Sequence, residues 1–181
     1  MSSTVLNAIE RIGKEKHGVG SLNNWGTDIV NLGAVVADEA IDNWEVVELD
    51  FNEKGERICR VLSDVSKAGY LIASVEDYLD DYETISNFFN AKGERARIVK
   101  FVEGKRFETS KYKLDDEAKP VKNGQKVHWD VDAKAYIISN GVSENAGYAD
   151  AGNKFVVVDA NGNYLDGQHT IRFEVVKSAT L

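Results

Sequence analysis

From about Trp44 to the end of the chain, short hydrophobic runs alternate with polar positions, and turn-forming residues separate the runs. The runs that pair as strand, turn and strand lie at 44–62, 104–114, 124–139 and 154–176. They are rich in the β-branched and aromatic residues that suit a pleated sheet. In the last of them Asn161-Gly162 separates two apolar stretches, which is a strong signal for a hairpin turn. Strands at this spacing predict a mainly β fold, a hairpin-rich β-barrel or β-sandwich, over residues 41–181.

The first forty residues lack this pattern. Val5, Ile9 and Ile12 share one helical face, so a short helix is expected over 4–12, ending near Gly13. The rest of the segment has scattered apolar residues between Gly and Asn. We therefore expect residues 1–40 to form an extended N-terminal arm with at most this short helix. The small, polar stretch 140–154 reads as a long loop.

One sequence segment occurs twice in similar form. Residues 41–61 align without a gap to residues 79–99, and nine of the 21 positions are identical. Both copies contain Phe-Asn-X-Lys-Gly-Glu-Arg, at 51–57 and at 89–95. Turn chemistry explains the Asn and the Gly but not the flanking Phe, Lys, Glu and Arg. The repeat is either an internal duplication of a hairpin or convergence on a good hairpin sequence.

Composition narrows the class of protein. The chain has 181 residues and a formal net charge of -8, which works against binding to nucleic acid or to an anionic membrane. No apolar run is long enough to span a bilayer, and the N-terminus lacks a signal-peptide layout. The single cysteine excludes an internal disulfide and favours a reducing cytoplasm.

Candidate chemistry is sparse. His17, His128 and His169 do not show the spacing of a zinc site, so no metal or cofactor is expected. Cys59 reads as a small buried apolar residue, since the sequence offers it no neighbouring base. The common phosphate-binding, hydrolase and metalloprotease motifs are missing. We therefore predict that the protein is not an enzyme.

Two clusters leave alternatives open. The acidic stretch 76–83 is most simply a solvated loop or a patch for a basic partner, while carboxylate catalysis or ion binding are the other interpretations. Trp25, Trp44 and Trp129 either fill the core or form a platform for a sugar.

Laid out as hairpins, the chain resembles the small structural proteins of tailed-phage heads. The resemblance rests on 37–77, with its "VVELD" strand, glycine hairpin and "GYLIAS" strand, and on the continuation 85–114. The implied family is that of head decoration or auxiliary capsid proteins. The extended N-terminus departs from the shortest of them and leaves open an inner-capsid, head-completion or tail role.

This resemblance implies a virion protein on the capsid surface, assembled in the host cytoplasm. Its partner would be the major capsid protein, and copies of itself on the shell, with no nucleic acid and no membrane. An apolar arm gains burial when it is ordered on a neighbour. The expected contacts are the apolar residues of that arm: Val5, Leu6, Ile9, Ile12, Leu22, Trp25, Ile29, Val30 and Leu32.

Two other functions compete with this one. A carbohydrate- or receptor-binding β-module of a phage tail requires an exposed tryptophan. An enzyme or accessory domain requires the acidic stretch, with Asp80 and Asp81 as the residues to test.

Overall fold

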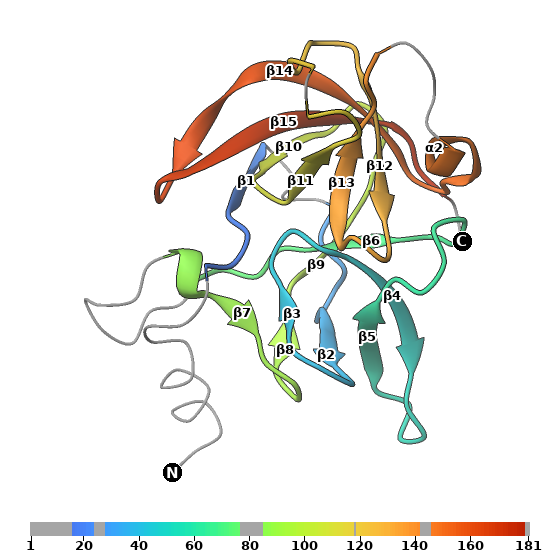
Figure 1. Ribbon diagram of the computed structural model, residues 1–181. Helices are drawn as coiled ribbons and strands as arrows, with labels where there is room; N and C mark the ends of the chain where they lie inside the picture. The colour runs from blue at the N-terminus through green and yellow to red at the C-terminus, as the bar shows by residue number, and fades with distance from the viewer. Residues whose placement is uncertain (1–15, 24–27, 77–84, 118, 142–145, 180–181) are drawn as a thin grey trace.

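The strands of the described residues form three β-sheets. The computed structural model describes residues 16–23, 28–76, 85–117, 119–141 and 146–179. Figure 1 shows the largest sheet lying across the top of the second one. The seven-stranded sheet has the order β1 (Gly20–Asn23), β10 (Arg106–Thr109), β15 (Gln168–Lys177), β14 (Lys154–Leu165), β12 (Lys126–Asp130), β13 (Ala135–Ile138) and β11 (Tyr112–Leu114).

The second sheet has six strands, and a third has two. The six-stranded order is β8 (Arg95–Ala96), β2 (Ala34–Val36), β5 (Arg57–Val61), β4 (Val46–Phe51), β6 (Tyr70–Ile72) and β9 (Ile98–Lys100). β3 (Ile41–Asp42) pairs with β7 (Phe89–Asn90). Both larger sheets are mixed, since β2 runs parallel to β5 and β11 runs parallel to β13. The prediction of a mainly β fold is confirmed, and the sandwich-like arrangement fits, because the sheets are not closed into a barrel.

An aromatic core joins the two larger sheets. Phe107 is fully buried, and its ring lies between 5.4 and 5.9 Å from the rings of Tyr136, Phe155, Phe173 and Phe101. Three residues of the six-stranded sheet, Val46, Leu71 and Val99, belong to the same cluster. Such aromatic contacts add to the free energy gained by burial.

The six-stranded sheet is buried on both faces. Val46, Leu71 and Val99 face the aromatic core, whereas their chain neighbours Val47, Ile72 and Ile98 belong to a second cluster with Val36 and Cys59. Successive side chains of a strand point to opposite faces. Because side chains on both faces of the sheet are buried, three of its strands contain adjacent apolar residues instead of strict alternation.

The expected N-terminal arm is integral to both sheets where the structure describes it. β1 pairs with β10 in the seven-stranded sheet, and β2 lies between β5 and β8 in the six-stranded one. Val19, Ala34 and Val36 are buried. Residues 1–15, which include the helix predicted over 4–12, lie outside the described residues. Both of these short strands take partners far along the chain.

Two of the predicted hairpins form as expected, β4–β5 and β12–β13. The last hairpin, β14–β15, turns at a different place. Asn161 and Gly162 lie within β14, at a register irregularity, and the turn is Asp166-Gly167, both with positive φ (47° and 73°) between the paired Leu165 and Gln168. That is the signature of a two-residue hairpin loop.

Other local expectations were wrong. The stretch 104–114 is not a hairpin, because β10 pairs with β1 and β15 while β11 pairs with β13. The predicted loop 140–154 contains a short helix, α2 (Ala146–Asp150). A single 3-10 turn, η1 (Ile85–Asn87), precedes β7. Among the described residues, no helix has the length and apolar character that crossing a bilayer would take.

Candidate functional site

A buried charged network lies where the sheets meet. The Lys111 ammonium, in the turn between β10 and β11, donates to Asp42 Oδ2 and to Glu45 Oε1, each at 2.6 Å. His17 Nδ1 lies 2.6 Å from the other oxygen of Asp42. The Glu45 side chain is 5% exposed and that of Lys111 is 15% exposed. We call these four residues the junction network.

Burial and charge act in opposite directions on these groups. Burial raises the pKa of the Glu45 carboxyl, and the Lys111 charge works against that rise. Burial alone would raise the pKa of Asp42, but the hydrogen bond with His17 and the Lys111 charge hold it below its usual range. Burial disfavours the Lys111 ammonium, yet the two carboxylates raise its pKa above the ordinary value.

The network borders a surface hollow of about 470 Å³ that is also lined by Lys16, Tyr112 and Lys134. Two neighbouring carboxyl groups whose pKa values are shifted in opposite directions can serve as the acid and the base of a catalytic site. Here Lys111 bonds to both of them, so the charges satisfy one another. Asp42 lies in β3 of the two-stranded sheet, Glu45 precedes β4 of the six-stranded sheet, and Lys111 follows β10 of the seven-stranded sheet. The network therefore links the three sheets, which is its fastening role.

A second surface lies on the six-stranded sheet. Leu32 is 77% exposed and Phe51 is 62% exposed. Arg57 lies between them: its guanidinium donates to Asn31 O at 2.8 Å and stands 5.8 Å from the Phe51 ring centroid. Arg95 donates to Leu32 O at 2.9 Å. We call Leu32, Phe51, Arg57 and Arg95 the tip surface. Figure 1 shows the β4–β5 hairpin beside it reaching away from the seven-stranded sheet.

Leu32 is presented in a strained conformation. Its φ is 62°, a left-handed value that is unusual for a branched side chain. The next residue, Gly33, also has positive φ (55°), and a Cβ there would stand 2.0 Å from Ala96 O. Strain of this kind persists only where the surroundings fix it. The two arginines supply that fixing through the loop's carbonyl oxygens.

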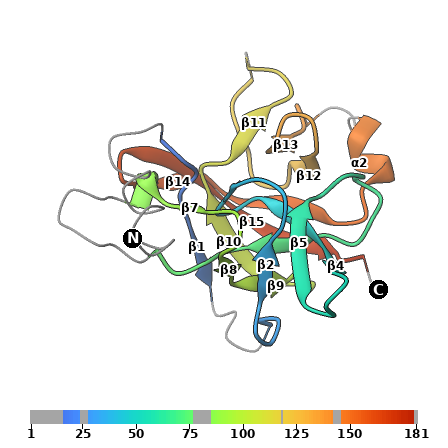
Figure 2. The ribbon, with the colours of Figure 1, turned by 90° about the horizontal axis from the view of Figure 1, so that it is seen from below.

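The sequence repeat converges on this loop. Arg57 and Arg95 occupy equivalent positions in the two copies, and both donate to carbonyls of residues 31–33. Glu56 of the first copy bonds to Arg95 of the second at 2.6 Å. Their strands β5 and β8 flank β2, as the view from below in Figure 2 shows. The two repeated arginines therefore contribute to one surface, and Glu56 links the two copies.

The two copies are nevertheless not two hairpins. In the second copy β7 pairs with β3 and β8 pairs with β2, so its strands do not pair with each other. Asn52 is half-buried and starts a turn in which its Oδ1 accepts from Lys54 N and Glu56 N. Its counterpart Asn90 is buried and donates to Ile41 O and Asn43 Oδ1. Both glycines, Gly55 and Gly93, keep positive φ.

The predicted contact residues are placed unevenly. Leu32 and Ile29 are exposed, at 77% and 41%. Val30 is 7% exposed and belongs to the second core, and Leu22 packs against the aromatic core. The remaining members of the predicted set lie outside the described residues: Val5, Leu6, Ile9, Ile12 and Trp25.

The other candidate residues are mostly internal. Trp44 and Trp129 are 3% and 1% exposed, so neither offers a sugar platform. Cys59 is buried, and burial raises the pKa of its thiol to about 11. Of the acidic stretch 76–83, only Glu76 is described. Within the described ranges, no three His, Cys, Asp or Glu side chains gather as a metal site would need.

Sequence reasoning missed Phe51, Arg57 and Arg95 as one surface, and it missed the junction network entirely. The repeat was the signal for the first, because it marked Arg57 and Arg95 as a pair. The network had no comparable signal, since Lys111 lies 69 residues from Asp42.

Comparison with known proteins agrees with a phage origin. The family described as "YonC prophage protein" matches residues 13–176. The "SPbeta prophage-derived uncharacterized protein YonC" of Bacillus subtilis (strain 168) is 37% identical over 181 residues, covering 98% of this chain and the whole of that relative. No solved structure matches the chain.

Proposed function

Because the chain belongs to the YonC prophage protein family, we propose that this phage-derived protein is a non-enzymatic structural component of a tailed-phage particle. In this role it binds the outside of the shell formed by the major capsid protein and stabilises it. The protein is assembled onto the shell in the host cytoplasm and stays on the capsid surface of the mature virion. Neighbouring copies on the shell are its second class of contact.

The tip surface is the observation that carries this proposal. Leu32 and Phe51 are large apolar side chains left open to solvent, at 77% and 62%. One of them, Leu32, is held in a strained conformation, and two arginines fix the loop that carries it. Exposed apolar residues beside arginine are typical of protein–protein interfaces.

The net charge and the burial of two tryptophans also support the proposed capsid-binding role. A net charge of -8 disfavours DNA and suits a basic patch on a protein shell. The competing carbohydrate-binding function loses Trp44 and Trp129 as a platform, because both are in the core. Many copies on one particle tolerate modest affinity per copy when each bridges two subunits.

The test compares binding to heads purified without this protein. We use Leu32→Asn, because Asn accepts left-handed φ, together with Phe51→Thr, which removes the aromatic ring and places another residue that favours β-strands. Each lost apolar contact is worth roughly 1.5 kcal/mol or more. The double variant should therefore bind about 100-fold more weakly in co-sedimentation.

The matched control is Tyr164→Thr with Val75→Asn, which removes two other exposed apolar side chains (74% and 65%). It should bind like the unchanged protein. Equal binding by the tip variant and the control would overturn the assignment of the tip surface. No binding of the unchanged protein to heads would overturn the capsid role itself.

A further inference from the structure

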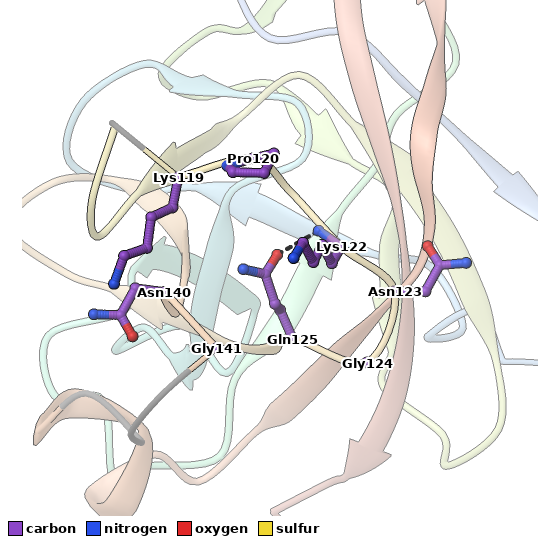
Figure 3. Close-up of a pocket in the computed structure, with 8 residues that line it drawn as sticks. All are labelled: Lys119, Pro120, Lys122, Asn123, Gly124, Gln125, Asn140 and Gly141. Carbon is purple, nitrogen blue, oxygen red and sulfur yellow. Dashed lines mark hydrogen bonds between the residues drawn. The ribbon is translucent and has the colours of Figure 1, made fainter.

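A pocket of about 440 Å³ opens among the loops of the seven-stranded sheet, and its lining includes three amide side chains and two lysines (Figure 3). It is formed by the loop that leads into β12 and by the residues that follow β13. The lining residues are Lys119, Pro120, Lys122, Asn123, Gly124, Gln125, Asn140 and Gly141. None of these belongs to the tip surface or to the junction network.

Gln125 fixes the chemical character of the pocket. Its side-chain Oε1 accepts a hydrogen bond from Lys122 N at 2.7 Å. A backbone N–H requires an oxygen acceptor, so the amide orientation is determined and Nε2 turns the other way, toward the pocket, as Figure 3 shows. The residue is 8% exposed, and none of the described residues accepts a hydrogen bond from Nε2. A largely buried amide thus offers two N–H donors to whatever enters.

The loop that carries Gln125 is held firmly against β14. Gly124 N donates to Val157 O at 2.8 Å, and Val157 N donates to Gln125 O at 2.9 Å. Asn123 Oδ1 accepts from Ala160 N at 2.7 Å. The donor is therefore preorganised, which lowers the entropic cost of binding.

The opposite wall leaves room over the amide. Gly141 has a φ of 81°, and a Cβ placed there would stand 3.6 Å from Gln125 Nε2. A side chain at this position would cover the donor. Glycine keeps the approach open and also accepts the left-handed backbone.

Two lysines set the charge of the ligand. Lys119 and Lys122 line the pocket, and Lys119 is only weakly engaged by Asp116, at 3.6 Å. Among the residues that line the pocket, these two lysines are the charged ones. Phosphate sites usually add a cradle of backbone N–H groups. Here the N–H groups of Lys122, Gly124 and Gln125 are already bonded within the protein, which favours a smaller acceptor that needs few donors.

We propose that this pocket binds a carboxylate, with one oxygen accepting from Gln125 Nε2 and the charge balanced by Lys119 and Lys122. The carboxylate is supplied by a small organic acid or by an acidic side chain or C-terminus of a bound protein. This site does not depend on the capsid role, because it uses a different face and a different kind of contact.

The test is a titration of the full-length ¹⁵N-labelled protein, observed at the Gln125 side-chain amide. Succinate should shift these resonances saturably, with a dissociation constant in the range of ~1–10 mM expected for a small anion. Phosphate and glucose at the same concentrations should shift them at least about tenfold less. A short peptide with a free C-terminus, compared with its amidated form, distinguishes a protein carboxylate from a free acid as the better ligand.

Gln125→Glu is the sharpest variant, because it keeps the size of the side chain and the acceptor for Lys122 N but replaces the donor with a negative charge. Succinate binding, followed on the amide of Gly141, should weaken by at least about tenfold, as it should in Lys119→Met with Lys122→Met. The control, Lys54→Met with Lys92→Met, removes two exposed lysines in the turns that precede β5 and β8 and should bind succinate normally. No saturable shift with any carboxylate, or unchanged binding by a correctly folded Gln125→Glu variant, would overturn the proposal.

Discussion

Replacing Lys111 by methionine would leave two buried carboxyl groups without the ammonium that they share. Lys111 Nζ stands 2.6 Å from both Asp42 Oδ2 and Glu45 Oε1, and Glu45 is the more deeply buried of the two. Removing one partner of a buried ion pair costs about 3–5 kcal/mol, because the remaining charge is left uncompensated. For a chain of this length, such a loss lowers the melting temperature by about 10 °C.

The loss should depend on pH, and the direction follows from Glu45. Burial already raises the pKa of this carboxyl above the reference value of 4.5, and the variant lacks the Lys111 charge that opposes the rise. Glu45 in the variant therefore takes up a proton at a higher pH and escapes the penalty of a buried charge. Asp42, whose pKa lies below 3.8 in the unchanged protein, also loses the Lys111 charge that helps to hold it there. The destabilisation should be largest near pH 7.5 and smaller by about 1 kcal/mol or more at pH 5.

The assay is urea unfolding at both pH values for the unchanged protein and for three variants. Lys134→Met is the matched control, because that lysine pairs with an exposed Glu39 and should cost no more than about 1 kcal/mol. Adding Glu45→Gln to Lys111→Met should recover part of the loss, since the two residues interact directly. A loss under 1 kcal/mol for Lys111→Met, or an equal loss at both pH values, would refute the fastening role of the network.

Three further outcomes follow from the packing. Phe107→Ala should destabilise by about 3–5 kcal/mol in urea unfolding, because that ring is fully buried at the centre of the aromatic core; a loss below 2 kcal/mol would mean that the core refills. Gly33→Ala should lower the free energy of unfolding by at least about 2 kcal/mol, since its Cβ would stand 2.0 Å from a backbone oxygen. Gly55→Ala, which has open space around it, should lower it by about 1 kcal/mol. Equal losses for the two variants would contradict the close approach at Gly33. Cys59, with a pKa of about 11, should react with a thiol reagent at pH 8 only after denaturation, and rapid labelling of the native protein would contradict its burial.

Local chemistry predicted the strands better than it predicted their partners. The β4–β5 hairpin was recoverable because strand, turn and strand are adjacent in sequence. The second copy of the same phrase retains its glycine turn, yet its strands pair with β3 and β2. Strand pairing depends on which surfaces meet in the folded core, and a short sequence does not contain that information.

The β14–β15 turn shows the same limit at finer scale. Asn161-Gly162 and Asp166-Gly167 both have turn chemistry, and the sequence favoured the first. The second is used because it lets Phe155 and Val157 pair with Val175 and Phe173 on the buried face. Asn161-Gly162 remains as an irregularity in β14, where Asp159 Oδ1 accepts hydrogen bonds from Asn161 N and Gly162 N.

The candidate sites were even less accessible from sequence. Leu32 was among the predicted contact residues, but its apolar partner Phe51 was read as part of a strand. The polar pocket depends on the orientation of one amide, which the bond from Lys122 N determines. Such features appear only when side chains from separate loops are placed together.

The central claim is that this protein is part of the phage particle, and its abundance there is the most direct test. Particles of the phage that encodes the chain would be purified on a gradient, and the protein would be quantified by mass spectrometry against the major capsid protein. A ratio near a simple fraction of the capsid copy number is the predicted result. A handful of copies would move the protein to the portal or tail, and its complete absence from particles would contradict the structural role.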